Sequence, residues 1–214
     1  MIPISRARAH WYRKQGILTP SGAPVAEVLS RTGWLRTLGG IEAYLGLRAR
    51  CQGFEPARLD AELGRGVWIT YAVRGCVYLV PRADLPLAMR VAEGQWKKRA
   101  LRDLEKVGVP EQEVQDLGEL AMAALNSSPS STQALRKALP EGAVRSLGEA
   151  GKKLGMSSAL PTALRFLEFA GRIQRQTHTG RADTEHYRWT VCTAHPLHDD
   201  DPGHDSAQHA RALA

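Results

Sequence analysis

The sequence predicts a mostly helical α+β protein with small β-hairpins, built as two winged helix-turn-helix modules in tandem. Two observations lead to this fold. Residues 1–92 and residues 119–190 each contain segments in which apolar side chains recur at helical spacing. In each region, two short β-rich segments separated by a turn follow the helices. Helices followed by a β-hairpin are typical of a winged helix.

The N-terminal winged-helix-like module, residues 1–92, is expected to begin with three short helices. They are predicted over residues 6–15, 24–32 and 40–50. A glycine follows each of them, as is common where helices end. Residues 67–80 are rich in β-branched and aromatic side chains, with Arg74 and Gly75 at a possible turn, so we expect a hairpin there.

The second module, residues 119–190, is expected to follow a connecting helical segment over residues 93–118. Helical composition extends over residues 84–106, and further helices are predicted over residues 112–125, 133–138 and 158–170. Ser157 or Ser158 is expected to cap the last helix. A polar turn through Gly180 then joins two β-rich segments, residues 172–176 and 186–190.

Residues 191–214 are expected to form a disordered tail, because they lack apolar periodicity and cannot offset their ordering entropy by burial. A metal site on the tail is not expected, since its histidines match no closed set of ligands. These histidines are His195, His198, His204 and His209. No metal is therefore assigned to these histidines.

Charge distinguishes the tail from the rest of the chain. The whole chain carries a formal net charge of +7. Residues 191–214 contribute four aspartates against a single arginine, or −3, so residues 1–190 carry +10. This excess favours a polyanionic partner, although a basic enzyme without such a partner stays open as an alternative.

Composition also indicates where the protein works. Neither a signal peptide nor a transmembrane run is recognisable, so we expect a cytoplasmic, nucleoid-associated protein without membrane contact. The three widely spaced cysteines, Cys51, Cys76 and Cys192, are expected to be reduced thiols.

The predicted helix over residues 158–170 is the candidate for the DNA major groove, because the second helix of a helix-turn-helix fits that groove. Its start at Ser158 can meet a phosphate, and Thr162 and Arg165 are expected on its outward side. Basic side chains around it are expected to clamp the phosphate backbone. They are Arg74, Arg145, Lys152, Lys153, Arg172, Arg175, Arg181 and Arg188. Each alone could equally be a solvated surface charge, but their clustering favours binding to double-stranded DNA.

Several short motifs carry a family resemblance. They are Arg6-Ala-Arg-Ala-His10, Leu38-Gly-Gly-Ile-Glu-Ala-Tyr44, Arg74-Gly-Cys-Val-Tyr-Leu-Val-Pro81, Leu167-Glu-Phe-Ala-Gly-Arg172 and Asp183-Thr-Glu-His-Tyr-Arg-Trp189. In this order they resemble the winged-helix DNA glycosylases of the AlkZ-like family, over about residues 4 to 190. The resemblance implies a tandem winged-helix fold that excises alkylated bases, or excises and unhooks crosslinked ones, without a metal or organic cofactor.

The resemblance also implies a catalytic position, at which this chain departs from the family. The family signature, Gln-x-Gln or Gln-x-Asp at the start of the third helix, corresponds here to Glu42 and Tyr44. An alkylated purine is cationic and leaves readily, so the enzyme chiefly needs to place a water and stabilise an oxocarbenium-like sugar. Glu42 could do both, although an ordinary exposed glutamate is the alternative. Relatives usually continue past the last winged helix, so the tail indicates a C-terminally short, divergent member.

Three functions stay open from the sequence. The first is a monofunctional DNA glycosylase, expected to be monomeric, with Glu42 as the base that orients water. The second is a non-catalytic DNA-binding protein or transcriptional regulator that reads or clamps a site. The third is a winged-helix module that binds proteins, because this fold does not by itself imply DNA contact.

Overall fold

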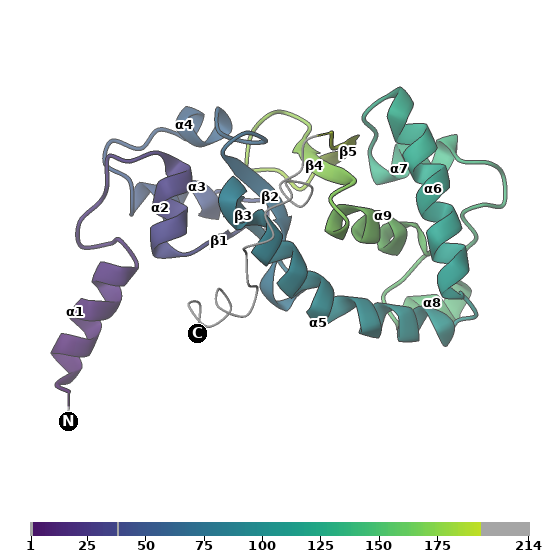
Figure 1. Ribbon diagram of the computed structural model, residues 1–214, viewed down its shortest axis with the longest axis horizontal. Coiled ribbons are helices and arrows are strands. Elements are labelled where there is room, and N and C mark those ends of the chain that lie inside the picture. Colours follow the sequence, from purple (N-terminus) through teal and green to yellow (C-terminus); the bar gives the residue numbers. More distant parts are fainter. Residues whose placement is uncertain (1, 38, 194–214) are drawn as a thin grey trace, which may run out of the picture. The chain divides into compact units, whose positions relative to one another are not determined.

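The computed structural model describes residues 2–37 and 39–193, which form two compact units (Figure 1). Within the described residues, unit 1 contains residues 2–37, 39–71, 76–85 and 177–186, and unit 2 contains residues 72–75, 86–176 and 187–193. Helices and small antiparallel pairs of strands make up both units, which confirms the mixed α+β class. The winged-helix interpretation and the four-part division of the chain stay predictions.

Unit 1 contains short helices and one three-stranded sheet. Its elements are α1 (Ile4–Lys14), α2 (Val25–Thr32), β1 (Leu35–Arg36), α3 (Glu42–Arg48), α4 (Pro56–Asp60), β2 (Val67–Tyr71), β3 (Val77–Pro81) and the single turn η2 (Arg82–Asp84). The three N-terminal helices and the hairpin expected from the sequence are therefore confirmed. Helix α4 and strand β1 were not predicted, because five and two residues are too short to show a periodicity.

The sheet of unit 1 has the order β1-β3-β2 and is antiparallel throughout. Leu79 in the central strand lies opposite both Leu35 and Ile69, and it is fully buried. Helix α2 packs against β3 and buries Val25 and Leu29. Burying one such aliphatic side chain stabilises the fold by about 1.5–3 kcal/mol, so Val25 and Leu29 contribute to holding α2 on the sheet.

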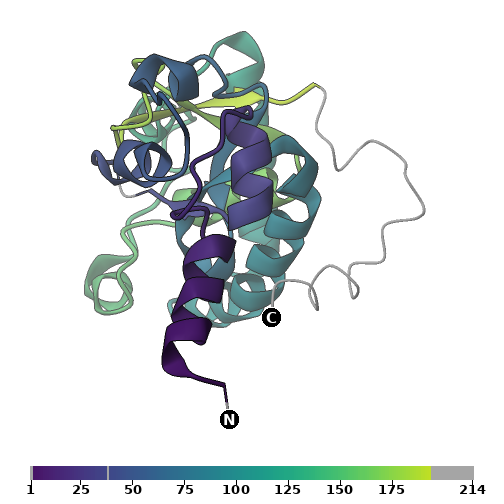
Figure 2. The ribbon, with the colours of Figure 1, turned by 90° about the vertical axis from the view of Figure 1, so that its left-hand side faces the viewer.

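Helix α1 is the exception within unit 1. None of its residues is buried, and it extends away from the other elements of the unit (Figures 1 and 2). Arg13 and Lys14 lie in its last turn. The helix therefore presents basic side chains, rather than a core-forming stripe, where the chain turns toward α2.

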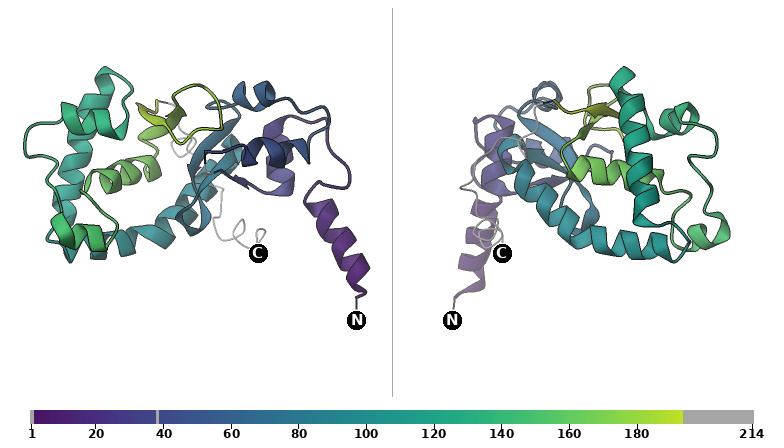
Figure 3. Two further views of the ribbon diagram at one scale, coloured as in Figure 1. Left: turned by 180° about the vertical axis from the view of Figure 1, so that it is seen from behind. Right: turned by 45° about the vertical axis from the view of Figure 1, so that its right-hand side comes forward.

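Unit 2 is mostly helical and carries the second hairpin (Figure 3). Its elements are η1 (Val73–Gly75), α5 (Leu85–Glu105, of which residues 86–105 belong to the unit), α6 (Glu111–Ser127), α7 (Thr132–Ala138), α8 (Gly148–Lys153), α9 (Leu160–Phe169), β4 (Ile173–Thr177, up to residue 176) and β5 (Tyr187–Val191). Helix α9 packs against α6, where Leu167 lies beside Gly118. The long helices and the hairpin were expected, whereas the six-residue helix α8 was not predicted.

The helices α7 and α9 of unit 2 begin with different kinds of N-cap. The hydroxyl of Ser131 caps α7 by accepting a hydrogen bond from the backbone N–H of Ala134, at 3.1 Å. The expectation that Ser157 or Ser158 caps α9 is wrong. The N-cap of α9 is Ala159, without a side-chain cap, because the Ser158 hydroxyl instead accepts a 2.6 Å hydrogen bond from Arg136.

Within the described residues, no helix combines the length and the apolar character that a membrane span requires. Across the same part of the chain, no three His, Cys, Asp or Glu side chains gather as they would around a metal ion. The histidines considered for a metal site, from His195 onward, lie outside the described residues, as does almost all of the tail.

Candidate nucleic-acid site

The candidate catalytic residue Glu42 lies in the first turn of α3 and is exposed. Its carboxylate folds back over the preceding glycine: a Cβ atom placed on Gly40 would lie 2.6 Å from Oε2 of Glu42. The absence of a side chain at residue 40 therefore gives the carboxylate the space that it occupies. An accessible carboxylate of this kind can accept a proton from a water molecule.

Tyr44 lies on the opposite, buried side of α3. Its hydroxyl donates a 2.6 Å hydrogen bond to Oδ1 of Asp60 and accepts one of 2.9 Å from the backbone N–H of Ala182. Burial and the hydrogen bond to Asp60 raise the pKa of Tyr44 to about 12. The structure thus gives Tyr44 a hydrogen-bonding role between α3, α4 and a distant loop. A catalytic role for Tyr44 stays a prediction.

That distant loop, residues 177–186, connects β4 to β5 and belongs to unit 1. Its Arg181 forms a bidentate pair with Asp183, at 3.0 and 2.6 Å, and its guanidinium carbon lies 5.8 Å from the centre of the Tyr44 ring. Arg181 lowers the pKa of the Asp183 carboxyl by hydrogen bonding to it. The structure therefore brings Arg181, predicted as a DNA contact, next to α3.

Gly39 fixes how closely this loop approaches the start of α3. A Cβ atom on Gly39 would lie 2.1 Å from Cγ and 2.7 Å from the backbone nitrogen of Glu185, and the residue has φ of +80°. Only glycine fits at this position. Residues 39–44 of the Leu38–Tyr44 motif and the loop 177–186 are thus packed together, although about 140 residues separate them in sequence.

The residues predicted on α9 are less accessible than expected. Thr162 is buried, with 5% of its surface exposed, so the expectation that it lies on the outward side is wrong. The apolar positions of α9 spread over much of its circumference, so the buried face is wider than the stripe assumed from the sequence. Ser158 is also buried, and Arg165 stacks on Trp96, with its guanidinium carbon 4.1 Å from the ring centre.

Arg175, another predicted DNA contact, is also largely enclosed. It forms two hydrogen bonds to the carboxylate of Glu168, at 3.0 and 3.1 Å, and the exposed fractions of the two side chains are 8% and 1%. Its guanidinium carbon also lies 4.8 Å from the centre of the Trp189 ring. This geometry is that of a structural ion pair.

Several other predicted contacts also have carboxylate partners. Arg145 pairs with Glu113, Arg172 with Glu119, and Lys152 with Glu149. Exposed pairs of this kind contribute only about 0–1 kcal/mol, so a phosphate can replace the carboxylate. Lys153, Arg188 and Arg74 are exposed, and Arg74 adopts a left-handed backbone conformation with φ of 59°.

Sequence reasoning missed three parts of this region: Asp60, Asp183 and the contact of Glu185 with Gly39. No local pattern indicated Asp60 or the contact of Glu185, because their partners Tyr44 and Gly39 belong to other elements. Asp183 pairs with Arg181 only two residues away, and no motif marked this pair. The motif that contains Asp183 was noted only as part of a resemblance. The sequence pattern of two strands predicts a hairpin, but it does not show which residues the connecting loop contacts.

Comparison with known proteins identifies the family to which the chain belongs. The family model for DNA glycosylase AlkZ-like proteins matches residues 40–214, and the chain belongs to this AlkZ-like family. The DNA glycosylase AlkZ of Streptomyces sahachiroi has a similar fold, with a TM-score of 0.59 at 17% sequence identity. The similarity covers 85% of this chain and 47% of that one, so this chain spans about half the length of its structural relative. No curated protein matches the chain in sequence.

Proposed function

We propose that this chain excises alkylated bases from double-stranded DNA by hydrolysing the N-glycosidic bond, with Glu42 as the residue that orients the attacking water. The position of Glu42 carries this proposal. It is an exposed carboxylate at the start of α3, where the family places its catalytic signature, next to the loop that carries Arg181. Family membership supports the reaction class.

The proposed reaction needs little from the protein beyond one carboxylate. Glu42 accepts a proton from water as the water oxygen bonds to the anomeric carbon of the sugar. The bond from that carbon to the alkylated base breaks, and its electron pair leaves with the cationic base, which becomes neutral. The negative charge of Glu42 also stabilises the oxocarbenium-like sugar. No metal or organic cofactor takes part in this scheme.

Tyr44 is proposed as a positioning residue. Its hydroxyl connects α3 to Asp60 and to the backbone of Ala182, so it fixes the loop beside the start of α3. The loop in turn holds Arg181 near this helix. A phenol with a pKa of about 12 remains protonated at neutral pH and keeps both hydrogen bonds.

Unit 2 is proposed to bind the duplex. The order of α6, α7, α9 and the strands β4 and β5 is consistent with a winged helix, and two winged helices in tandem remain our interpretation of the chain. Exposed basic side chains such as Lys153 and Arg188 would contact phosphates. A monomer acting on nucleoid DNA in the cytoplasm is part of the same proposal.

The decisive experiment compares base release from methylated duplex DNA by the wild type and by Glu42→Gln. We expect the variant to be slower by about 10²–10⁴-fold, because a proton acceptor has been lost, while its affinity for the duplex is retained. Glu55→Gln is the matched control, since Glu55 is also an exposed glutamate at the start of a short helix of unit 1. Equal rates for Glu42→Gln and the wild type would contradict the proposal.

A non-catalytic DNA-binding protein is the second candidate. The observation in its favour is that neither position of the family signature holds an amide in this chain, which has Glu42 and Tyr44. It predicts tight binding to methylated duplex without base release. Under this alternative, Arg165→Ala weakens binding at some sequences more than at others, whereas replacing a phosphate contact weakens it uniformly.

A further inference from the structure

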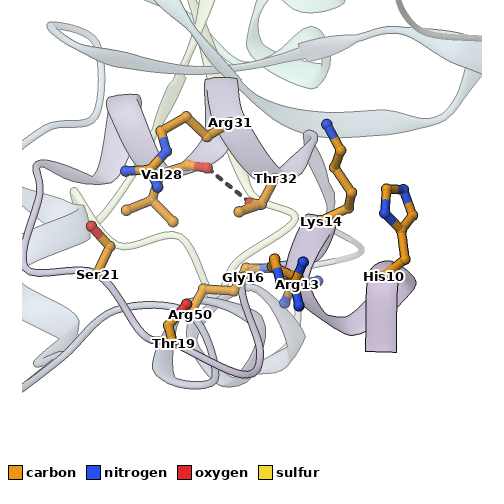
Figure 4. Close-up of a pocket in the computed structure, with 10 residues that line it drawn as sticks. All are labelled: His10, Arg13, Lys14, Gly16, Thr19, Ser21, Val28, Arg31, Thr32 and Arg50. Carbon is orange, nitrogen blue, oxygen red and sulfur yellow. Dashed lines mark hydrogen bonds between the residues drawn. The ribbon is translucent and has the colours of Figure 1, made fainter. Parts of the chain in front are cut away.

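A basic hollow lies in unit 1 beside helices α1 and α2 (Figure 4). Its volume is about 490 Å³, and it is formed by the last turns of α1 and α2, the chain that joins them, and Arg50 just after α3. Half of the residues that line it are basic: His10, Arg13, Lys14, Arg31 and Arg50. Among its described lining residues none is acidic. We call it the α1–α2 pocket.

The protein neutralises little of this charge. Arg31 pairs with Glu27 at 3.5 Å, and both side chains are more than half exposed. In the described part of the chain, no hydrogen bond or ion pair engages the side chains of His10, Arg13 or Lys14. These cations are therefore available to a ligand.

Helix dipoles account for only part of the cluster. Basic residues in the last turn of a helix offset about half a negative charge at that end. Both α1 and α2 end at the pocket, so together they call for about one positive charge. The pocket holds three arginines and one lysine, and Glu27 offsets one of them. About two positive charges remain without an opposite charge.

Arg50 adds a donor that the fold leaves unused. Its Nη1 donates to the carbonyl of Gly46 at 2.8 Å and its Nη2 to Oε1 of Gln15 at 3.1 Å, but its buried Nε has no hydrogen-bond partner. Burial lowers the pKa of Arg50. An unsatisfied buried N–H carries a desolvation penalty, so Arg50 adds an unused donor to this cluster of cations.

Gly16 keeps the pocket open. A Cβ atom on Gly16 would lie 2.7 Å from Cγ2 of Thr32 and 3.7 Å from Cγ of Arg50, and its φ of +69° suits glycine. Thr32 and Arg50 both line the pocket. Because Gly16 has no side chain, the space between Thr32 and Arg50 stays open.

We infer that the α1–α2 pocket binds a phosphate group of the DNA backbone. This inference rests on the proposed function and extends it, because it assigns unit 1 a phosphate contact of its own. Arg50 is hydrogen-bonded to α3, the helix that carries Glu42, so the contact is coupled to the candidate catalytic helix. Phosphate contacts of this kind set the position of a protein on DNA and carry no sequence information.

The test measures binding of the full chain to undamaged duplex DNA as a function of salt. The double variant Arg13→Gln/Lys14→Gln removes two pocket cations, and Arg6→Gln/Arg8→Gln is the control, because it removes the same charge from the same helix outside the pocket. We expect the pocket variant to weaken binding about tenfold more than the control. The slope of log K against log salt should also become shallower by about 0.9, the value for one phosphate contact.

Equal effects of the two double variants would overturn the inference, because only general electrostatics would then be at work. In a duplex with one methylated base, replacing the flanking phosphates singly by neutral methylphosphonates should reveal a position at which the wild type loses affinity and the pocket variant does not. Inorganic phosphate is the second probe. If it binds the wild type and not the pocket variant while both bind duplex equally, the pocket takes free phosphate and the DNA assignment fails.

The outcome is independent of catalysis. Binding to undamaged DNA is measured without base release, so an inactive protein still reports on the pocket. Conversely, if the pocket variant binds as well as its control while the wild type releases methylated bases, the proposed function stands and only the pocket assignment is lost. Since Arg13 and Lys14 are exposed, their replacement should leave the unfolding temperature unchanged.

Discussion

At the residue scale, two arginines that were both expected to contact DNA have different surroundings. The arginines expected to contact DNA include Arg175, whose guanidinium is held by Glu168 and covered by Trp189. Arg172 lies at the start of the same hairpin, but its pair with Glu119 is open to solvent. Both residues look alike in the sequence, whereas their surroundings predict a large loss of stability on mutation of Arg175 and a small one for Arg172.

Replacing Arg175 by methionine should destabilise the protein by about 3–5 kcal/mol, because the buried Glu168 carboxylate loses two hydrogen bonds from the guanidinium. Urea unfolding at neutral pH measures this change. Arg172→Met, which opens an exposed pair, should cost no more than about 1 kcal/mol. A stable Arg175→Met variant that has lost only DNA affinity would show that Arg175 acts as a phosphate contact instead.

At the element scale, the start of α3 and the loop 177–186 depend on two adjacent glycines with different constraints. Gly39 faces the backbone of Glu185, which cannot move aside, whereas Gly40 faces only the end of the flexible Glu42 side chain. A side chain at residue 39 would therefore separate the loop from α3. A side chain at residue 40 would displace only a carboxylate.

Gly40→Ala should therefore reduce base release while changing stability little. The new methyl group would lie 2.6 Å from Oε2 of Glu42, so the carboxylate must rotate away from the position where it orients water. We expect a loss of about 10²-fold, in line with a misplaced catalytic group. The assay is base release alongside thermal unfolding, and Gly22→Ala is the control because its Cβ meets nothing within 4 Å. If Gly40→Ala releases bases as fast as the wild type, the position of the Glu42 carboxylate does not matter for the reaction.

At the scale of the whole molecule, stability at high pH should depend on one buried phenol. The pKa of Tyr44 is about 12 in the folded chain, above the value of about 10 expected when the chain is unfolded. A group whose pKa is raised by folding contributes its full stability below the unfolded pKa and loses it as the pH rises through the folded pKa. The corresponding window is pH 10 to about 12.

We therefore expect the unfolding temperature to fall steeply between about pH 10 and pH 12, and Tyr44→Phe to flatten that part of the curve. Thermal unfolding followed by circular dichroism over this range measures it. Tyr12→Phe is the control, since Tyr12 is 46% exposed. If Tyr44→Phe and the wild type keep the same slope, deprotonation of Tyr44 is not the event that limits alkaline stability.

The sequence by itself determined most of the elements of this protein. Apolar spacing predicted the long helices α5, α6 and α9, and β-branched runs predicted both hairpins, because these signals are local and repeat within a single element. The order of its motifs also indicated the AlkZ-like family, to which the chain belongs. Short elements such as α4 and β1 were missed, because a few residues carry no period.

The tertiary structure decided what each candidate residue contacts. It placed Tyr44 against Asp60 and Ala182, buried Thr162, enclosed Arg175, and gathered the basic residues of α1 and α2 with Arg50 around one pocket. Charge, hydrogen bonding and burial at these positions depend on partners that lie up to 138 residues away in the chain. No local pattern records such partners, because the free energy of each contact belongs to the pair and not to either residue alone.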